Sequence, residues 1–251
     1  MDPHAESLTY RLEIGNALTF NNPPPLDHET QHFALRLENG MLTVVMKEHH
    51  PSTRSARRRV DAFLRSWELS AALAYGPGAL QFAFQSSNVV DCAGKATILE
   101  AEPAVYTMTG MPAILTVGRA TYLPPPADFV ASPDVVTLWN RYQGYREGRE
   151  LLPAMAYFCL TLLTARGDGR EGAAVMYRVH PEVLRKLSEL TSVRGDEATG
   201  RKFLADLQPL TPQESRWLED VVRALIQRVG EQAAGTAPLQ QITMADFPPL
   251  K

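Results

Sequence analysis

Hydrophobic and polar residues alternate in the first part of the chain. Apolar side chains occupy every second position over residues 10–14, 33–37 and 42–46. Between the last two runs, Asn39-Gly40 is a dipeptide that tolerates the positive φ angles of a two-residue hairpin turn. This alternation is typical of strands with one buried face, so it predicts an antiparallel sheet.

A helical pattern interrupts the strands after residue 52. Ser52 or Thr53 can cap a helix, and Gly76-Pro77-Gly78 can end it. The apolar positions between these ends fall on one helical stripe: Val60, Phe63, Leu64, Trp67, Ala71 and Ala74. Alternation resumes at residues 80–84, so we expect one amphipathic helix that packs on the sheet.

The periodicity changes across the proline triplet at residues 124–126. Beyond it, apolar residues recur at helical spacing, and Ser132-Pro133-Asp134 is typical of a helix start. Residues 151–163 are apolar nearly all round, which predicts a buried helix too short to span a bilayer. Thr211, Pro212 and Glu214 form the pattern of a capped helix start.

These patterns predict an α+β protein, with an N-terminal antiparallel sheet that carries one packed helix and a C-terminal all-α helical bundle. We place a β-rich domain at residues 1–130 and the helical domain at 131–230. The remainder, 231–251, is rich in Ala, Gln and Pro, and we expect a flexible tail.

Composition narrows the class of protein. The chain has 251 residues, 45% of them hydrophobic, and a net charge of −3, so wholesale disorder and a generally basic surface are excluded. Cys92 and Cys159 are the only cysteines, too few for a disulfide framework. With no signal-peptide pattern, we expect a cytoplasmic protein without a membrane segment and without a cofactor.

Three stretches carry a family resemblance: residues 151–158, 187–196 and 210–218. They resemble the HEPN (higher eukaryotes and prokaryotes nucleotide-binding) helical domains, in particular those that follow a β-rich domain in bacterial defence proteins. The resemblance covers roughly residues 132–230. It implies a helical architecture, a homodimer and a role in bacterial defence or stress response. Residues 63–68 and 80–84 also look like the front of uncharacterised bacterial proteins, which implies no activity.

Active HEPN members are ribonucleases that use an Arg followed, after four to six residues, by a His. Following Arg194, those positions hold Thr199, Gly200 and Arg201, and none of the histidines stands at this spacing after any arginine. The resemblance therefore implies a degenerate ribonuclease site. A ribonuclease with a non-standard site would draw on Arg178, His180 and Arg194.

Basic clusters are the candidates for nucleic-acid binding, because guanidinium groups hold phosphates well. The candidate residues are Arg54, Arg57, Arg58, Arg194, Arg201 and Lys202. The alternative for both clusters is an ordinary solvated helix face. If these clusters bind a partner, it could be an RNA or a protein.

Residues 28–32 read His-Glu-Thr-Gln-His, the H-E-x-x-H pattern of zinc proteases. On a helix, His28 and His32 would lie about 6 Å apart along the axis and reach one metal ion. On a strand they would lie about 13 Å apart. Three prolines before the pattern and alternation after it favour a strand, so we expect no metal here. His49 and His50 would point opposite ways on a strand, and we expect a turn.

The leading hypothesis is a non-enzymatic binding or assembly protein, with a HEPN-like part that dimerises and a β-rich part that binds a partner. Two enzyme hypotheses remain as alternatives. One is the non-standard ribonuclease, and the other is a zinc-dependent hydrolase that uses His28, Glu29 and His32.

Overall fold

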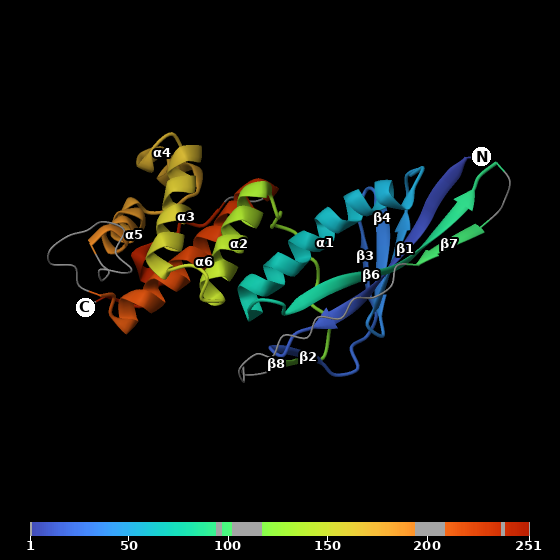
Figure 1. Ribbon diagram of the computed structural model, residues 1–251, viewed down its shortest axis with the longest axis horizontal. Helices are drawn as coiled ribbons and strands as arrows, with labels where there is room; N and C mark the ends of the chain where they lie inside the picture. The colour runs from blue at the N-terminus through green and yellow to red at the C-terminus, as the bar shows by residue number, and fades with distance from the viewer. Residues whose placement is uncertain (1, 94–96, 102–116, 194–208, 237–238, 251) are drawn as a thin grey trace. The chain divides into compact units, whose positions relative to one another are not determined.

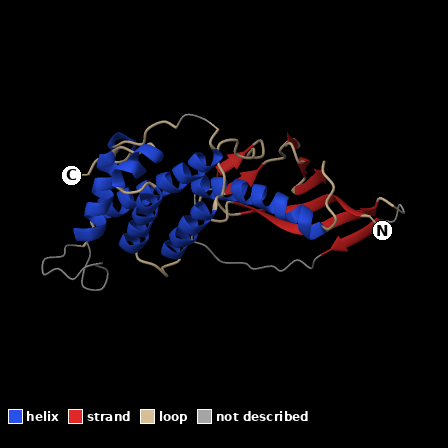
Figure 2. Cartoon of the chain, turned by 90° about the horizontal axis from the view of Figure 1, so that it is seen from above, coloured by secondary structure: helices blue, strands red, loops and turns tan. Residues whose placement is uncertain are grey.

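The computed structural model describes residues 2–93, 97–101, 117–193, 209–236 and 239–250. The chain divides after Pro126 into an N-terminal unit, Met1–Pro126, and a C-terminal unit, Ala127–Lys251. The described strands β1 to β8 belong to the N-terminal unit, and the C-terminal unit is built from helices (Figure 2). The predicted α+β class is confirmed, and the division lies four residues before the boundary that we placed at residue 130.

The N-terminal unit is organised by an antiparallel sheet (Figure 1). In spatial order its strands are β3 (Leu26–Glu29), β4 (Phe33–Glu38), β5 (Met41–Met46), β1 (Pro3–Ile14), β6 (Leu80–Asp91) and β7 (Thr97–Ala101). A separate parallel pair joins β2 (Leu18–Phe20) to β8 (Val117–Arg119). The first strand in the sequence therefore lies inside the sheet, between β5 and β6.

The predicted hairpin forms between β4 and β5. Asn39 and Gly40 have positive φ angles of 51° and 75°. A two-residue hairpin turn needs such angles because its twist then matches the right-handed twist of the flanking strands. The register pairs Leu37 with Leu42 and Leu35 with Val44, and all four side chains are buried. Alternation along the sequence thus becomes one buried face of the sheet.

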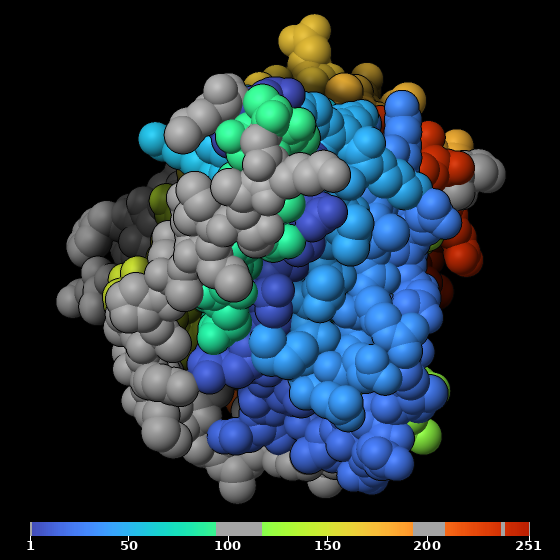
Figure 3. All heavy atoms as spheres, turned by 90° about the vertical axis from the view of Figure 1, so that its right-hand side faces the viewer, coloured from blue at the N-terminus to red at the C-terminus, as the bar shows by residue number. Residues whose placement is uncertain are grey.

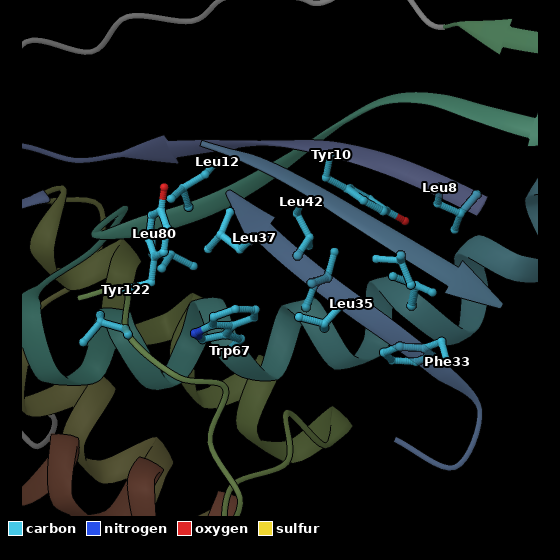
Figure 4. Close-up of a cluster of buried hydrophobic side chains, with 14 of the residues drawn as sticks. Leu8, Tyr10, Leu12, Phe33, Leu35, Leu37, Leu42, Trp67, Leu80 and Tyr122 are labelled. Carbon is cyan, nitrogen blue, oxygen red and sulfur yellow. The ribbon is translucent and has the colours of Figure 1, made fainter. Parts of the chain in front are cut away.

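The helix α1, Thr53–Tyr75, covers that buried face. Ser52 caps its start by accepting a hydrogen bond from the backbone N–H of Ser55. Trp67, 1% exposed, lies against side chains from the strands, among them Leu37 and Leu42 (Figure 4). This packing turns the opposite face of α1 toward solvent.

The C-terminal unit is the predicted helical bundle. Its helices are α2 (Pro133–Arg146), α3 (Leu152–Arg166), α4 (Arg170–Met176), α5 (Pro181–Val193) and α6 (Pro212–Ala234), with a 3-10 turn η1 at Met244–Asp246. The capping box at the start of α6 forms as the sequence predicts. No helix in the described part of the chain has both the length and the apolar character needed to cross a bilayer.

The prediction of a flexible tail at residues 231–251 is wrong for its described part. Helix α6 continues to Ala234, and further on Ile242 exchanges backbone hydrogen bonds with Arg178 and His180. The buried guanidinium of Arg228 explains this order. It donates to the carbonyl oxygens of Tyr177 at 2.8 Å and Gln240 at 2.6 Å, so that it joins the tail to the end of α4.

We expect Arg228→Ala to release residues 239–250 from the bundle. The change leaves buried carbonyl oxygens without their charged donor, which lowers the free energy of unfolding by about 3 kcal/mol. Hydrogen exchange of the backbone N–H of Ile242 and His180 should become much faster. Arg216→Ala, at an exposed position of the same helix, is the control. Unchanged exchange at Ile242 in Arg228→Ala would show that the tail is held by other contacts.

Candidate functional site

The H-E-x-x-H pattern lies on a hairpin. His28 and Glu29 belong to strand β3, and His32 lies in the turn before β4, so the strand expectation is confirmed. The ring of His28 stacks on Phe63 with centroids 5.6 Å apart. Glu29 forms an ion pair with Lys47 at 2.5 Å. The residues of the motif therefore have separate partners and do not form the helical ligand pair of a zinc protease.

His32 links the end of β5 to helix α1. Its Nδ1 lies 2.7 Å from a carboxylate oxygen of Glu48, and its Nε2 lies 3.4 Å from Nη1 of Arg59. A neutral ring fits both contacts by donating from Nδ1 and accepting at Nε2. The hydrogen bond from His32 lowers the pKa of Glu48. Both ring nitrogens are thus engaged in contacts within the N-terminal unit.

The residues of the non-standard ribonuclease site are only partly described. Arg178 and His180 are exposed and lie between α4 and α5. His180 accepts a hydrogen bond at Nδ1 from the backbone N–H of Glu182, a contact that caps the start of α5. Arg194, Arg201 and Lys202 lie outside the described residues. The described part of the chain therefore does not assemble this site.

The arginines at the start of α1 form a distinct surface, which we call the arginine face: Arg54, Arg57 and Arg58. Spacings of three and four residues put these side chains on one side of the helix. Arg57 is half-buried, with its guanidinium 4.1 Å from the centroid of the Phe84 ring. Arg54 and Arg58 are exposed. The face therefore combines one fixed guanidinium with two that extend into solvent.

A chain of polar contacts connects the arginine face to the centre of the sheet. Arg57 forms an ion pair with Asp61 at 3.5 Å, and Asp61 accepts a hydrogen bond of 2.7 Å from the hydroxyl of Tyr10 on β1. Burial is the main cause that raises the pKa of Tyr10, and the hydrogen bond to Asp61 raises this pKa further. The hydroxyl of Tyr10 therefore keeps the proton that it donates to Asp61. The orientation of Arg57 is therefore set by the sheet beneath it.

Positive charge at the start of α1 is electrostatically unfavourable. The first turn of the helix contains no acidic residue, although the N-terminal end of a helix favours negative charge. A cation near this end costs about 0.3–1 kcal/mol, and a like-charged pair such as Arg54 and Arg58 adds about 0.2–0.5 kcal/mol. Proteins break local rules of this kind at functional or strained sites. An anion would remove both penalties.

The structure also assembles one group of side chains that the sequence analysis did not join. Asp2, His49 and Cys92 each place one potential ligand atom within 4.8 Å of the others, and all three residues are exposed. We call this group the strand-end cluster. A long sequence separation hides it, because residues 2, 49 and 92 meet only through the pairing of strands. The signal that could have found it is the antiparallel pairing of β1 with both β5 and β6.

Comparison of the chain with models of known families, with curated proteins and with solved structures finds no match.

The two thiols should differ sharply in reactivity. Cys92 is exposed, whereas Cys159 lies buried in α3, and burial raises the pKa of Cys159 to about 12. Since the thiolate is the reactive form, a maleimide should label one site in the native protein near neutral pH and a second site only in denaturant. Cys92→Ser should abolish the native reaction. Equal labelling rates for both thiols in the native protein would contradict the described burial of Cys159.

Proposed function

We propose that this chain is a non-enzymatic binding protein whose N-terminal unit holds the phosphates of an RNA on the arginine face. The observation that carries the proposal is that Arg54 and Arg58 share one exposed side of α1 and have no acidic partner in the described part of the chain. A planar guanidinium offers a fork of donors that matches phosphate oxygens.

Local charge has to supply the attraction, because the whole chain carries a net charge of −3. Binding that depends on a few arginines is weak at physiological salt and strongly dependent on salt concentration. Arg57 is already ordered in the free protein, since its contacts with Phe84 and Asp61 hold its side chain in place. A side chain that is already ordered loses less conformational entropy on binding.

The contacts of the candidate catalytic histidines support a non-enzymatic role. His32 bridges Glu48 and Arg59, His28 stacks on Phe63, and His180 caps α5. Each therefore has a structural task in the described part of the chain. The HEPN-like resemblance makes bacterial defence or stress response the setting that we propose.

Replacement of both exposed arginines tests the RNA proposal. We expect Arg54→Gln/Arg58→Gln to weaken binding of single-stranded RNA by about tenfold at moderate salt. Each neutralised phosphate on a single strand contributes about 0.7 to the slope of log K against log salt concentration, so this slope should fall by about 1.4. Fluorescence anisotropy over a salt series measures both quantities.

The matched control is Arg11→Gln/Arg36→Gln. It removes the same charge from the same unit, but Arg11 pairs with Glu13, and Arg36 pairs with Asp27 and Glu38. The control should keep the affinity and the slope of the unaltered protein. Equal losses in both double variants would mean that net charge alone is responsible, and wild-type protein that does not bind RNA would reject the proposal outright.

We propose that the C-terminal unit mediates self-association. This second part rests on the HEPN-like resemblance and on two adjacent apolar side chains of α4, since Val175 is 77% exposed and Met176 is 41% exposed. Large contiguous apolar patches on a surface mark interaction sites, and we propose that these two side chains belong to one.

We expect light scattering at micromolar concentration to give the mass of a dimer, and Val175→Glu to give a monomer because it buries a charge in the interface. Val45→Glu is the control, since Val45 is also exposed but lies on β5 of the N-terminal unit. A monomeric wild-type protein would remove the self-association proposal and leave the RNA proposal untouched.

A further inference from the structure

The topology of the sheet brings three chain segments to one place. Strand β1 is antiparallel to both of its neighbours, so its first residues lie beside the last residues of β5 and β6. Asp2 immediately precedes β1, His49 follows β5, and Cys92 follows β6. Figure 1 shows the start of β1, marked N, next to the arrowhead of β6. Figure 3 looks onto this end, where blue N-terminal residues border the green of β6 and β7.

Backbone hydrogen bonds hold the strand-end cluster in position. The N–H of Cys92 donates to the carbonyl oxygen of Asp2 at 2.9 Å, and the N–H of Ala5 donates to the carbonyl oxygen of His50 at the same distance. The N–H of Asp2 also donates to Oδ1 of Asp91 at 2.8 Å. All three segments are therefore tied to one another next to the side chains of the cluster.

Two further histidines, His4 and His50, lie next to His49. The ring of His4 stacks on that of His49 with centroids 5.2 Å apart, and Nδ1 of His4 accepts a hydrogen bond from the N–H of His50 at 3.1 Å. A neutral His4 therefore carries its proton on Nε2. His50 is buried, and its Nε2 has no hydrogen-bond partner in the described part of the chain. The imidazole of His49 is thus supported from one side while its Nε2 faces Asp2 at 3.2 Å.

We propose that Asp2, His49 and Cys92 bind a divalent transition-metal ion of the zinc class. A carboxylate oxygen, an imidazole nitrogen and a thiolate sulfur are the ligand types that Zn²⁺ takes in proteins, whereas Mg²⁺ and Ca²⁺ prefer oxygen alone. The thiol releases its proton when the metal–sulfur bond forms. Three protein ligands leave one position of a tetrahedral ion for solvent.

The distances fit such an ion after a small adjustment. Bonds of about 2.0 Å to nitrogen and oxygen and about 2.3 Å to sulfur separate the ligand atoms of a tetrahedral site by about 3.3–3.6 Å. The contact between Asp2 and His49, at 3.2 Å, is already at this spacing. The widest separation in the cluster is at most 4.8 Å, so it has to shrink by little more than an ångström. The exposed side chain of Cys92 can supply this movement by rotation.

Titration of the full, untagged chain with Co²⁺ and Zn²⁺ tests the site, because a polyhistidine tag would compete for metal. We expect one Co²⁺ per chain and a thiolate-to-cobalt charge-transfer band, which Zn²⁺ then displaces. Zn²⁺ should also slow maleimide labelling of Cys92 by at least about tenfold, since the coordinated sulfur is no longer a free nucleophile. Neither readout depends on RNA binding, so the two proposals fail separately.

Three variants assign the ligands. Cys92→Ser should abolish the band, while Asp2→Asn and His49→Gln should weaken Co²⁺ binding by at least about 100-fold. These exposed substitutions keep the backbone hydrogen bonds, and circular dichroism checks that the variants fold. The control is His28→Ala/His32→Ala, which changes the zinc-protease pattern and should leave binding unaltered.

A wild-type chain without the band overturns the proposal. Undiminished binding in both Asp2→Asn and His49→Gln does so as well, because it would show a thiol that captures metal on its own. Loss of binding in His28→Ala/His32→Ala, with the strand-end variants unaffected, would move the site to the hairpin and likewise reject the assignment.

Discussion

The pairing of β1 with β5 on one side and β6 on the other is the constraint on which the N-terminal unit depends. This strand extends from Pro3 to Ile14 and supplies Leu8, Tyr10 and Leu12 to the buried face under α1. Since antiparallel register is fixed wherever one face is buried, a shift of one residue would turn these side chains to solvent. The same register fixes which residues meet at each end of the sheet.

Both sites proposed in the N-terminal unit follow from this strand. Tyr10 reaches from β1 to Asp61, and Asp61 orients Arg57, so the arginine face is tied to the middle of the sheet. At the end of the sheet, residues next to the start of β1 meet the residues that follow β5 and β6. The two proposed sites would therefore share this strand as their support, one through α1 and the other at the end of the sheet. In the helical unit, the buried guanidinium of Arg228 holds the C-terminal segment to the end of α4 through the carbonyl oxygens of Tyr177 and Gln240.

The sequence predicted the features that neighbouring residues determine. Asn39-Gly40 gave the hairpin, the stripe around Trp67 gave α1, and Thr211 with Glu214 gave the start of α6. Features that join distant residues were missed. The contact of Arg228 with Gln240 needs a folded bundle, and composition alone suggested a free tail. Asp2 and Cys92 meet only through strand order, which alternation does not reveal. The H-E-x-x-H match shows why a motif needs its structural context. The spacing of His28 and His32 has meaning only on a helix, and the prolines and the alternation around the motif already predicted the strand that the structure has.

A crystal structure of the protein with Zn²⁺, with diffraction recorded at the zinc absorption edge, tests most directly whether the pairing of β1 builds a site. The pairing predicts one anomalous peak bounded by Asp2, His49 and Cys92, at about 2.0–2.3 Å from one atom of each. It also predicts that Cys92 lies beside Asp2, in the register that pairs Pro3 of β1 with Asp91 of β6. A peak beside His28 and His32, or none at the end of β1, would contradict the proposal that these strand ends form a metal site.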